Sequence, residues 1–197
     1  KYQNIDILCE DELKNKEEIF NRKAVALCDN SILFDKSKLQ IGVGRKDNEF
    51  CDIFRLDDSL GAIIQVKQFR GSSSLSHLFV QSRFYGESFL FDQPFLDEIR
   101  GKIEEDPEIK APLKEKALNF IPNKIKDNTG NKYNVKLWLL YDKDQPKPTK
   151  KDLSLMARYE LKTSYERLCD RLSFNGMTVS FIPVKRTHTK KTIKKTN

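Results

Sequence analysis

The feature that most constrains the fold is a pair of apolar runs separated by a short polar stretch. The runs cover residues 50–56 and 62–69, and the residues Asp57 to Gly61 lie between them. Two such runs around a stretch rich in Asp, Ser and Gly predict a β-hairpin. If the loop contains four residues, Leu56 pairs with Gly61, and the rest of the chain is arranged around this hairpin.

This register gives the hairpin a polar centre. Asp52 falls opposite Gln65, and Phe50 falls opposite Lys67. Side chains alternate along a strand, so Asp52, Gln65 and Lys67 share one face of the sheet. An acid and an ammonium on an apolar face are costly unless they pair, bind a metal or take part in chemistry. A shift of one residue would separate the three groups.

Composition indicates a soluble protein with a polyanionic partner. The 197 residues have a mean hydropathy of −0.62, and 33% of them are charged, which is typical of one globular domain. The net charge of +7 favours nucleic acid as a partner. Part of the basic excess lies in the tail 185–197. A solvated, disordered terminus is the other interpretation of that tail.

Cysteine usage and hydropathy point to the cytoplasm. The four cysteines are widely spaced, form no CxxC pair and have only two histidines as potential co-ligands, which is not a zinc pattern. They are typical of reduced core residues. No stretch approaches the roughly 18 apolar residues of a membrane span, and no signal peptide is evident. The chain starts at Lys1 without a methionine, so a fragment of a longer protein is one expectation.

Before the hairpin, we expect a helix over about 11–21 and a strand over 31–43 that is broken at Asp35-Lys36. Residues 24–28 form either a short strand or an extension of the helix. Gly42 and Gly44 indicate a turn. After the hairpin, the loop 70–74 ends in a candidate helix N-cap at Ser74, and a helix follows with Leu75, Leu78, Phe79 and Ser82 at helical spacing.

The loop 70–74 has two interpretations. A Gly-Ser loop that opens a helix can hold a phosphate on its free N–H groups, or it can be an ordinary capped helix start. His77, in the same helix, is either a general base or a hydrogen-bonded structural group.

The second half of the chain predicts a parallel crossover. Residues 92–131 are charged and contain four prolines, so they should form short helical or loop pieces. Residues 135–141 form an apolar run of strand length, typical of a buried central strand. An amphipathic helix through Leu161 and Leu172, ended by Asn175-Gly176, then leads to a strand over 177–184.

These elements predict one α/β domain over 1–184, with a mixed central sheet flanked by helices. Its core covers 31–90 and 133–184, with a variable helical insert over 92–131. The basic tail 185–197 follows, and we expect it to be disordered.

The order of elements, with an acid on one hairpin strand and Gln-x-Lys on the next, resembles the PD-(D/E)XK, or restriction-endonuclease-like, nuclease superfamily. Asp52, Gln65 and Lys67 match its motif. Gln81-x-x-x-Tyr85 resembles the helix motif of RecB-type members. The stretches 48–52 and 64–67 and the run GSSSLSHLF at 71–79 resemble more closely the C-terminal half of an uncharacterised bacterial family found near phage-defence genes.

The resemblance implies a Mg²⁺-dependent (or Mn²⁺-dependent) endonuclease of bacterial antiviral defence, a phosphodiester hydrolase. Asp52, Gln65 and the carbonyl of Val66 would be metal ligands, and Lys67 the catalytic lysine. Gln65 departs from the commoner Glu and lowers the charge of the site. A glutamate could restore that charge, the candidates being Glu49, Glu17 and Glu18.

The same resemblance implies DNA rather than RNA as the substrate. A homodimer, or a further domain upstream of Lys1, is a further expected partner. The expected nucleic-acid-binding residues are Arg70, Ser72, Ser73, Ser74, His77, Gln81, Lys185 and Arg186.

Two other interpretations stay open. Asp52 could pair with Lys67 across the hairpin, which would make the fold a catalytically inactive module that binds nucleic acid or a partner protein. The chain could also be the sensor or assembly half of a longer protein.

Overall fold

The computed structural model describes residues 6–7, 16–34, 38–43, 46–57, 59–70 and 72–186. Its main element is a mixed sheet with strand order β1-β8-β7-β6-β5-β2. β6 is antiparallel to β5 and parallel to β7, so the predicted single α/β domain with a mixed central sheet is confirmed. The strands are β1 Asp6–Ile7, β2 Ser31–Leu33, β5 Ile53–Asp57, β6 Leu60–Gln68, β7 Tyr133–Asp142 and β8 Gly176–Arg186.

The hairpin β5–β6 has the predicted register, with Leu56 opposite Gly61. The pairing continues to Asp57 and Leu60, so the connection is shorter than the expected four-residue loop. The expected pairings of Asp52 with Gln65 and of Phe50 with Lys67 are wrong, because β5 begins only at Ile53 and the ladder ends at the pair Ile53–Ile64. The end of β6 therefore extends beyond its antiparallel neighbour.

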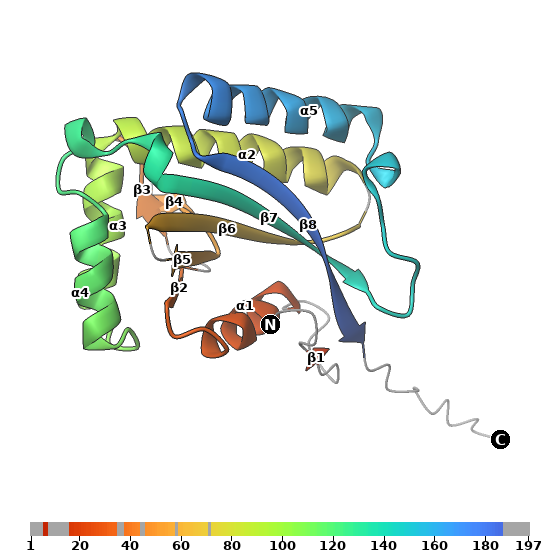
Figure 1. The fold of residues 1–197 in the computed structure, drawn as a ribbon, viewed down its shortest axis with the longest axis horizontal. Helices are drawn as coiled ribbons and strands as arrows, with labels where there is room; N and C mark the ends of the chain where they lie inside the picture. Colours follow the sequence, from red (N-terminus) through yellow and green to blue (C-terminus); the bar gives the residue numbers. More distant parts are fainter. Residues whose placement is uncertain are drawn as a thin grey trace.

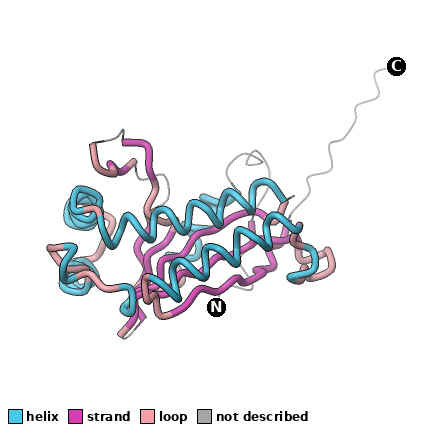
Figure 2. Tube along the Cα trace, turned by 90° about the horizontal axis from the view of Figure 1, so that it is seen from above, coloured by secondary structure: helices cyan, strands magenta, loops and turns pink. Residues whose placement is uncertain are grey.

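Helices cover both faces of the sheet. α2 (Ser72–Phe91) and α5 (Leu155–Tyr165) lie on one face, and α1 (Lys16–Ala26) lies on the other (Figure 1). Viewed from above, two long helices run side by side over the strands (Figure 2). A large apolar cluster fills the α2 side, and a smaller one around Phe20, Ile64 and Trp138 fills the α1 side. The sheet is thus buried on both faces, which suits its parallel part.

The predicted crossover is confirmed, since β7 and β8 are parallel neighbours joined through α5. The predicted helix end at Asn175-Gly176 is wrong. A π-helical turn over Glu166–Arg171 follows α5, and Ser173 then has a φ of 57°. Gly176 already begins β8, so the chain leaves the helix at Leu172, where its apolar pattern ends, and not at the predicted stop.

The region 92–131 contains α3 (Gln93–Glu105) and α4 (Ala111–Phe120), followed by 3₁₀ turns over Ile125–Asp127 and Gly130–Lys132. Asp92 caps α3 by accepting the N–H of Phe95 at 2.9 Å. Both helices lie beside one end of the sheet (Figure 1). A further 3₁₀ turn over Lys150–Asp152 precedes α5.

Several expected boundaries near the first strands are wrong. The first helix runs to Ala26 rather than Asn21, so residues 24–26 extend it; its expected start at 11–15 lies outside the described residues. The expected strand 31–43 is divided, because β3 (Leu39–Gln40) leaves the main sheet and pairs with β4 (Lys46–Asn48). The turn at Gly42 is confirmed, with a φ of 56°, whereas Gly44 is outside the described residues.

Ser74 is not an N-cap. α2 already begins at Ser72, and the Ser74 hydroxyl donates to the carbonyl of Arg70 at 2.7 Å. Cys51 is buried, Cys28 and Cys169 are partly buried, and all three are free thiols; Cys9 lies outside the described residues. Among the helices of the described chain, none combines the length and the apolar character needed to cross a membrane.

Candidate functional site

The candidate site forms where β6 extends beyond the end of its neighbour β5. The N–H of Asp52 donates to the carbonyl of Ile64 at 3.0 Å, the last backbone bond on that side. The next two N–H groups of β6 on the same edge meet carboxylates instead. Val66 donates to Asp52 Oδ2 at 2.7 Å, and Gln68 donates to Glu17 Oε1 at 2.9 Å. Two acids thus take over the role of a neighbouring strand, because buried backbone N–H groups need a partner.

α1 holds both acids in place. Glu17 belongs to its first turn, and Asn21 follows one turn later on the same face. The Nδ2 of Asn21 donates to Asp52 Oδ1 at 3.2 Å. Asn21 is fully buried, and its Oδ1 has no hydrogen-bond partner among the described residues. Both oxygens of Asp52 therefore accept a hydrogen bond, one from α1 and one from β6.

Lys67 forms an ion pair with Glu17. Its Nζ lies 3.1 Å from Glu17 Oε2, and both side chains are partly exposed. Glu18, the other glutamate expected from this helix, pairs with Arg22 at 3.4 Å on an exposed part of α1. The position of α1 against β6 thus selects Glu17 as the glutamate beside Lys67.

Gln65 reaches α2 from the same strand. It is buried, and its Oε1 accepts a hydrogen bond from the hydroxyl of Ser82, which is also buried. The same hydroxyl lies 2.7 Å from the carbonyl of Leu78, one turn earlier in α2. Gln65 and Lys67 leave β6 on the same face, as alternation along the strand predicts, but the ammonium of Lys67 contacts Glu17 of α1.

A pocket of about 250 Å³ lies between α1, β6 and α2. The pocket brings together most of the predicted site: Glu17, Glu49, Asp52, Gln65, Val66, Lys67 and Gln81. Cys51, Leu78 and Tyr85 complete its wall. Three carboxylates face one ammonium, so the pocket is acidic although the chain as a whole carries a charge of +7.

The other expected nucleic-acid contacts lie outside this pocket. Arg70 is exposed and lines a different cavity with Phe69 and Tyr141. His77 is exposed on α2, whereas Lys185 is exposed near the end of β8, where Arg186 is the last residue. Ser72 and Ser73 lie in the first turn of α2, and the tail beyond residue 186 is outside the described residues.

The donor set suits a hard cation that keeps water ligands. Within the described residues, no group of three or more His, Cys, Asp or Glu side chains is arranged to enclose a metal. Mg²⁺ does not need such a cage, since it is commonly held by one or two carboxylates and several waters. Asp52, the amide of Gln65 and the carbonyl of Val66 supply oxygen donors of that kind.

Cys51 is not a ligand of this type. Burial raises the pKa of its thiol well above the usual value, and the adjacent charge of Asp52 raises it further. The thiol is therefore protonated at neutral pH, which makes it a poor nucleophile and a poor metal ligand.

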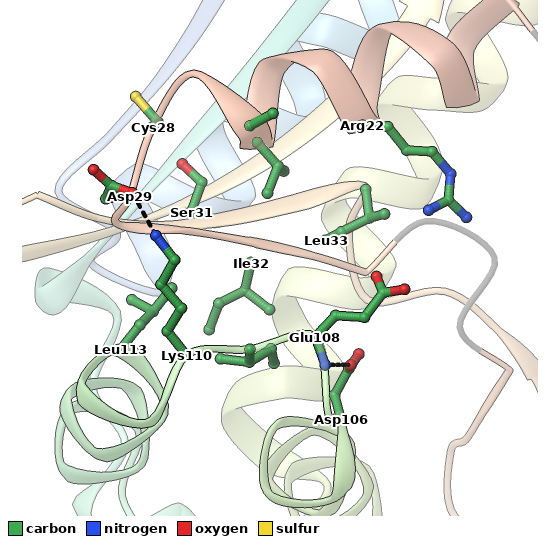
Figure 3. A pocket seen from close by; sticks show the side chains of 13 residues that line it. Arg22, Cys28, Asp29, Ser31, Ile32, Leu33, Asp106, Glu108, Lys110 and Leu113 are labelled. Atoms are coloured by element: carbon green, nitrogen blue, oxygen red, sulfur yellow. Dashed lines mark hydrogen bonds and ion pairs between the residues drawn. The ribbon is translucent and has the colours of Figure 1, made fainter.

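A second pocket, of about 260 Å³, lies between α1, β2 and the segment before α4 (Figure 3). Two contacts engage part of its polar lining. Lys110 Nζ lies 3.0 Å from Asp29 Oδ1, and Asp106 Oδ1 accepts the N–H of Glu108 at 2.9 Å. None of the residues predicted for chemistry lines it.

Sequence reasoning missed Asn21 and Ser82. Both carried a signal: Asn21 lies one helical turn after Glu17, and Ser82 is a polar residue at helical spacing with Leu75, Leu78 and Phe79. A polar side chain on the apolar face of a helix must find a partner when it is buried, and here each finds a residue of the candidate site.

No curated protein and no solved structure significantly matches the chain. One family model matches residues 1–183, which is nearly the whole sequence. The chain therefore belongs to DUF6119, a family of unknown function.

Proposed function

We propose that this protein is a metal-dependent nuclease that hydrolyses phosphodiester bonds, with DNA as its substrate, in the cytoplasm as part of bacterial anti-phage defence. The observation that carries the proposal is the convergence of Glu17, Asp52, Gln65 and Lys67 on one pocket from three separate elements. The resemblance of the sequence to the PD-(D/E)XK superfamily implies the same roles for Asp52, Gln65 and Lys67.

Each residue has a definite part in such a reaction. Asp52, Gln65 and the carbonyl of Val66 would hold Mg²⁺ or Mn²⁺, which supplies hydroxide at neutral pH and neutralises charge on the phosphoryl group. Lys67, one position beyond Val66, would stabilise charge that develops on the phosphate. An acidic pocket repels a phosphodiester, so a cation is needed before the substrate can approach.

The positive charge of the whole chain would attract nucleic acid over a longer distance than the pocket does. A net charge of +7 favours binding of nucleic acid in a salt-dependent, sequence-independent way. Arg70, His77 and Lys185 are exposed and available for phosphate contacts outside the pocket. For cleavage of both strands, two copies of the pocket would have to act together, which favours a homodimer.

One observation supports an inactive module instead. Both oxygens of Asp52 and both oxygens of Glu17 already accept hydrogen bonds from the protein. The two acids could thus serve only to satisfy the free edge of β6. The protein would then bind nucleic acid or a partner protein without cleaving anything.

The deciding experiment is cleavage of labelled plasmid, single-stranded DNA and RNA with Mg²⁺, Mn²⁺ or EDTA. The test variants are Asp52→Asn and Lys67→Met, which remove a charge with little change in shape. Lys126→Ala and Asp127→Asn, at exposed positions of a 3₁₀ turn, are matched controls. We expect about a 100-fold or greater loss of rate in the test variants only. Binding without metal-dependent cleavage by the wild type would establish the inactive module.

A further inference from the structure

The contact between Gln65 and Ser82 brings two acceptors to a single hydroxyl proton. The Ser82 hydroxyl lies within hydrogen-bond distance of two acceptors, Gln65 Oε1 and the carbonyl of Leu78. A hydroxyl carries one proton, so it can donate to only one of them at a time. Gln65, Ser82 and Leu78 are all buried, so each of these polar groups needs a hydrogen-bond partner.

A half-turn of the Gln65 amide gives a second way to satisfy the same groups. With its oxygen toward Ser82, as in this structure, the amide accepts the hydroxyl proton. With its nitrogen toward Ser82, the amide N–H donates to the Ser82 oxygen, and the Ser82 hydroxyl donates to the carbonyl of Leu78 instead. The second arrangement is possible because a serine in a helix commonly donates to the carbonyl one turn earlier.

The other end of the amide belongs to the acidic pocket that Gln65 lines. Glu17, Glu49 and Asp52 are the carboxylates of this pocket. Without a cation, their charge favours the amide nitrogen on the pocket side, because N–H groups donate to carboxylates. A divalent cation reverses this preference, because Mg²⁺ and Mn²⁺ bind amide oxygen and not amide nitrogen.

We propose that Ser82 is a positioning residue that lets Gln65 turn its amide oxygen toward a divalent cation. In the cation-bound site, Gln65 Nε2 would donate to the Ser82 oxygen, and the Ser82 hydroxyl would donate to the carbonyl of Leu78. This inference rests on the proposed metal site and adds the reason why a glutamine functions there. A carboxylate has two equivalent oxygens and needs no such partner, whereas an amide must be held with the correct end outward.

A double-mutant cycle tests the orientation role. Mn²⁺ affinity is measured by titration calorimetry for the wild type, Ser82→Ala, Gln65→Glu and the double variant. We expect Ser82→Ala to weaken Mn²⁺ binding about 10-fold beside Gln65, as removal of a group that orients a metal ligand does. Beside a glutamate at position 65, the same change should have little effect. An equal loss in both backgrounds would mean that Ser82 only supports packing, and would overturn the inference.

Ser164→Ala is the matched control. Ser164 is also a fully buried helical serine, and its hydroxyl donates to the carbonyl of Phe79 at 2.8 Å. It belongs to α5 and does not line the pocket. Its replacement should leave Mn²⁺ affinity unchanged.

A measurement on the wild type avoids any effect of substitution on folding. The side-chain amide protons of Gln65 are followed by ¹⁵N-edited nuclear Overhauser spectroscopy with and without Mg²⁺. We expect contacts from Nε2–H to the Ser82 methylene to appear only with Mg²⁺. Identical spectra at saturating Mg²⁺ would contradict the rotation.

The two proposals fail in different ways. If the wild type binds no Mn²⁺, or if Asp52→Asn binds it equally well, the metal site is absent and both proposals fall. If binding depends on Asp52 but the cycle shows no coupling between Ser82 and Gln65, the nuclease proposal stands and the role of Ser82 is rejected.

Discussion

Glu17 and Lys67 are 50 positions apart in the sequence, yet Lys67 Nζ donates to Glu17 Oε2 at 3.1 Å. The other oxygen of Glu17 accepts the N–H of Gln68, so one carboxylate joins α1 to two successive residues of β6. α1 is therefore part of the candidate site and not merely a cover for the sheet.

This double role of Glu17 predicts a graded loss of stability. Glu17→Gln keeps an acceptor for Gln68 and loses only a partly exposed ion pair, which should cost about 1 kcal/mol or less. Glu17→Ala leaves the N–H of Gln68 without its acceptor, which should cost about 1–3 kcal/mol. Urea denaturation measures both. The loss of stability caused by Glu17→Gln should become smaller at high salt. A loss that does not change with salt concentration would contradict an electrostatic origin.

Asp52 should also prove important for folding. Asp52→Ala removes the acceptor of two donors, Asn21 Nδ2 and the N–H of Val66, and we expect a loss of about 1–3 kcal/mol in the free energy of unfolding. Asp52→Asn retains one oxygen and should lose less. Asp127→Ala, at an exposed position, is the control and should change stability by no more than about 0.5 kcal/mol. Chemical denaturation that ranks the alanine variant as the milder one would refute this account of Asp52.

Asp57 predicts an acid-sensitive contribution to stability. Burial acts to raise its pKa, but the hydrogen bond and charge of Arg55, together with Lys136, outweigh burial and leave the pKa below the usual value. The contribution is therefore complete above the unfolded pKa of about 3.9 and is lost as the pH falls through the lower folded pKa.

The measurement is the difference in unfolding free energy between the wild type and Asp57→Asn as a function of pH. This difference should be constant above about pH 5 and should shrink below about pH 4. A difference that grows on acidification would show that the pKa of Asp57 is raised in the folded protein.

Two glycines should respond to alanine in opposite directions. A Cβ on Gly130 would lie 2.2 Å from the carbonyl oxygen of Leu172, so Gly130→Ala must displace backbone and should cost about 1–3 kcal/mol. A Cβ on Gly101, within α3, meets nothing within 4 Å. Gly101→Ala should therefore stabilise by about 0.5–1 kcal/mol. Thermal unfolding distinguishes the two, and destabilisation by Gly101→Ala would be the contrary result.

The hairpin and the crossover could be predicted from sequence because their signals are local. The polar stretch before Gly61 determines the turn, and the apolar run 135–141 is followed closely by an amphipathic helix and a further strand. Alternation along β6 then places Gln65 and Lys67 on one face without knowledge of any other element.

The features that could not be predicted from sequence depend on contacts between distant parts of the chain. Sequence could not choose among Glu17, Glu18 and Glu49, because the choice depends on how α1 docks on β6. Asn21 meets Asp52 across 31 positions, and no local pattern specifies such a pair. The predicted helix boundaries were wrong where the chain turns in a way that no local pattern indicates, as at Ser173 with its positive φ.

The end of β6 has one further consequence. A strand that outruns its neighbour exposes backbone groups to which a strand of another molecule can add, and this is a common route to aggregation. Asp52 and Glu17 occupy the N–H groups of Val66 and Gln68 on that edge. The two acids therefore keep this edge of β6 closed to other copies of the chain, whether or not the pocket performs any chemistry.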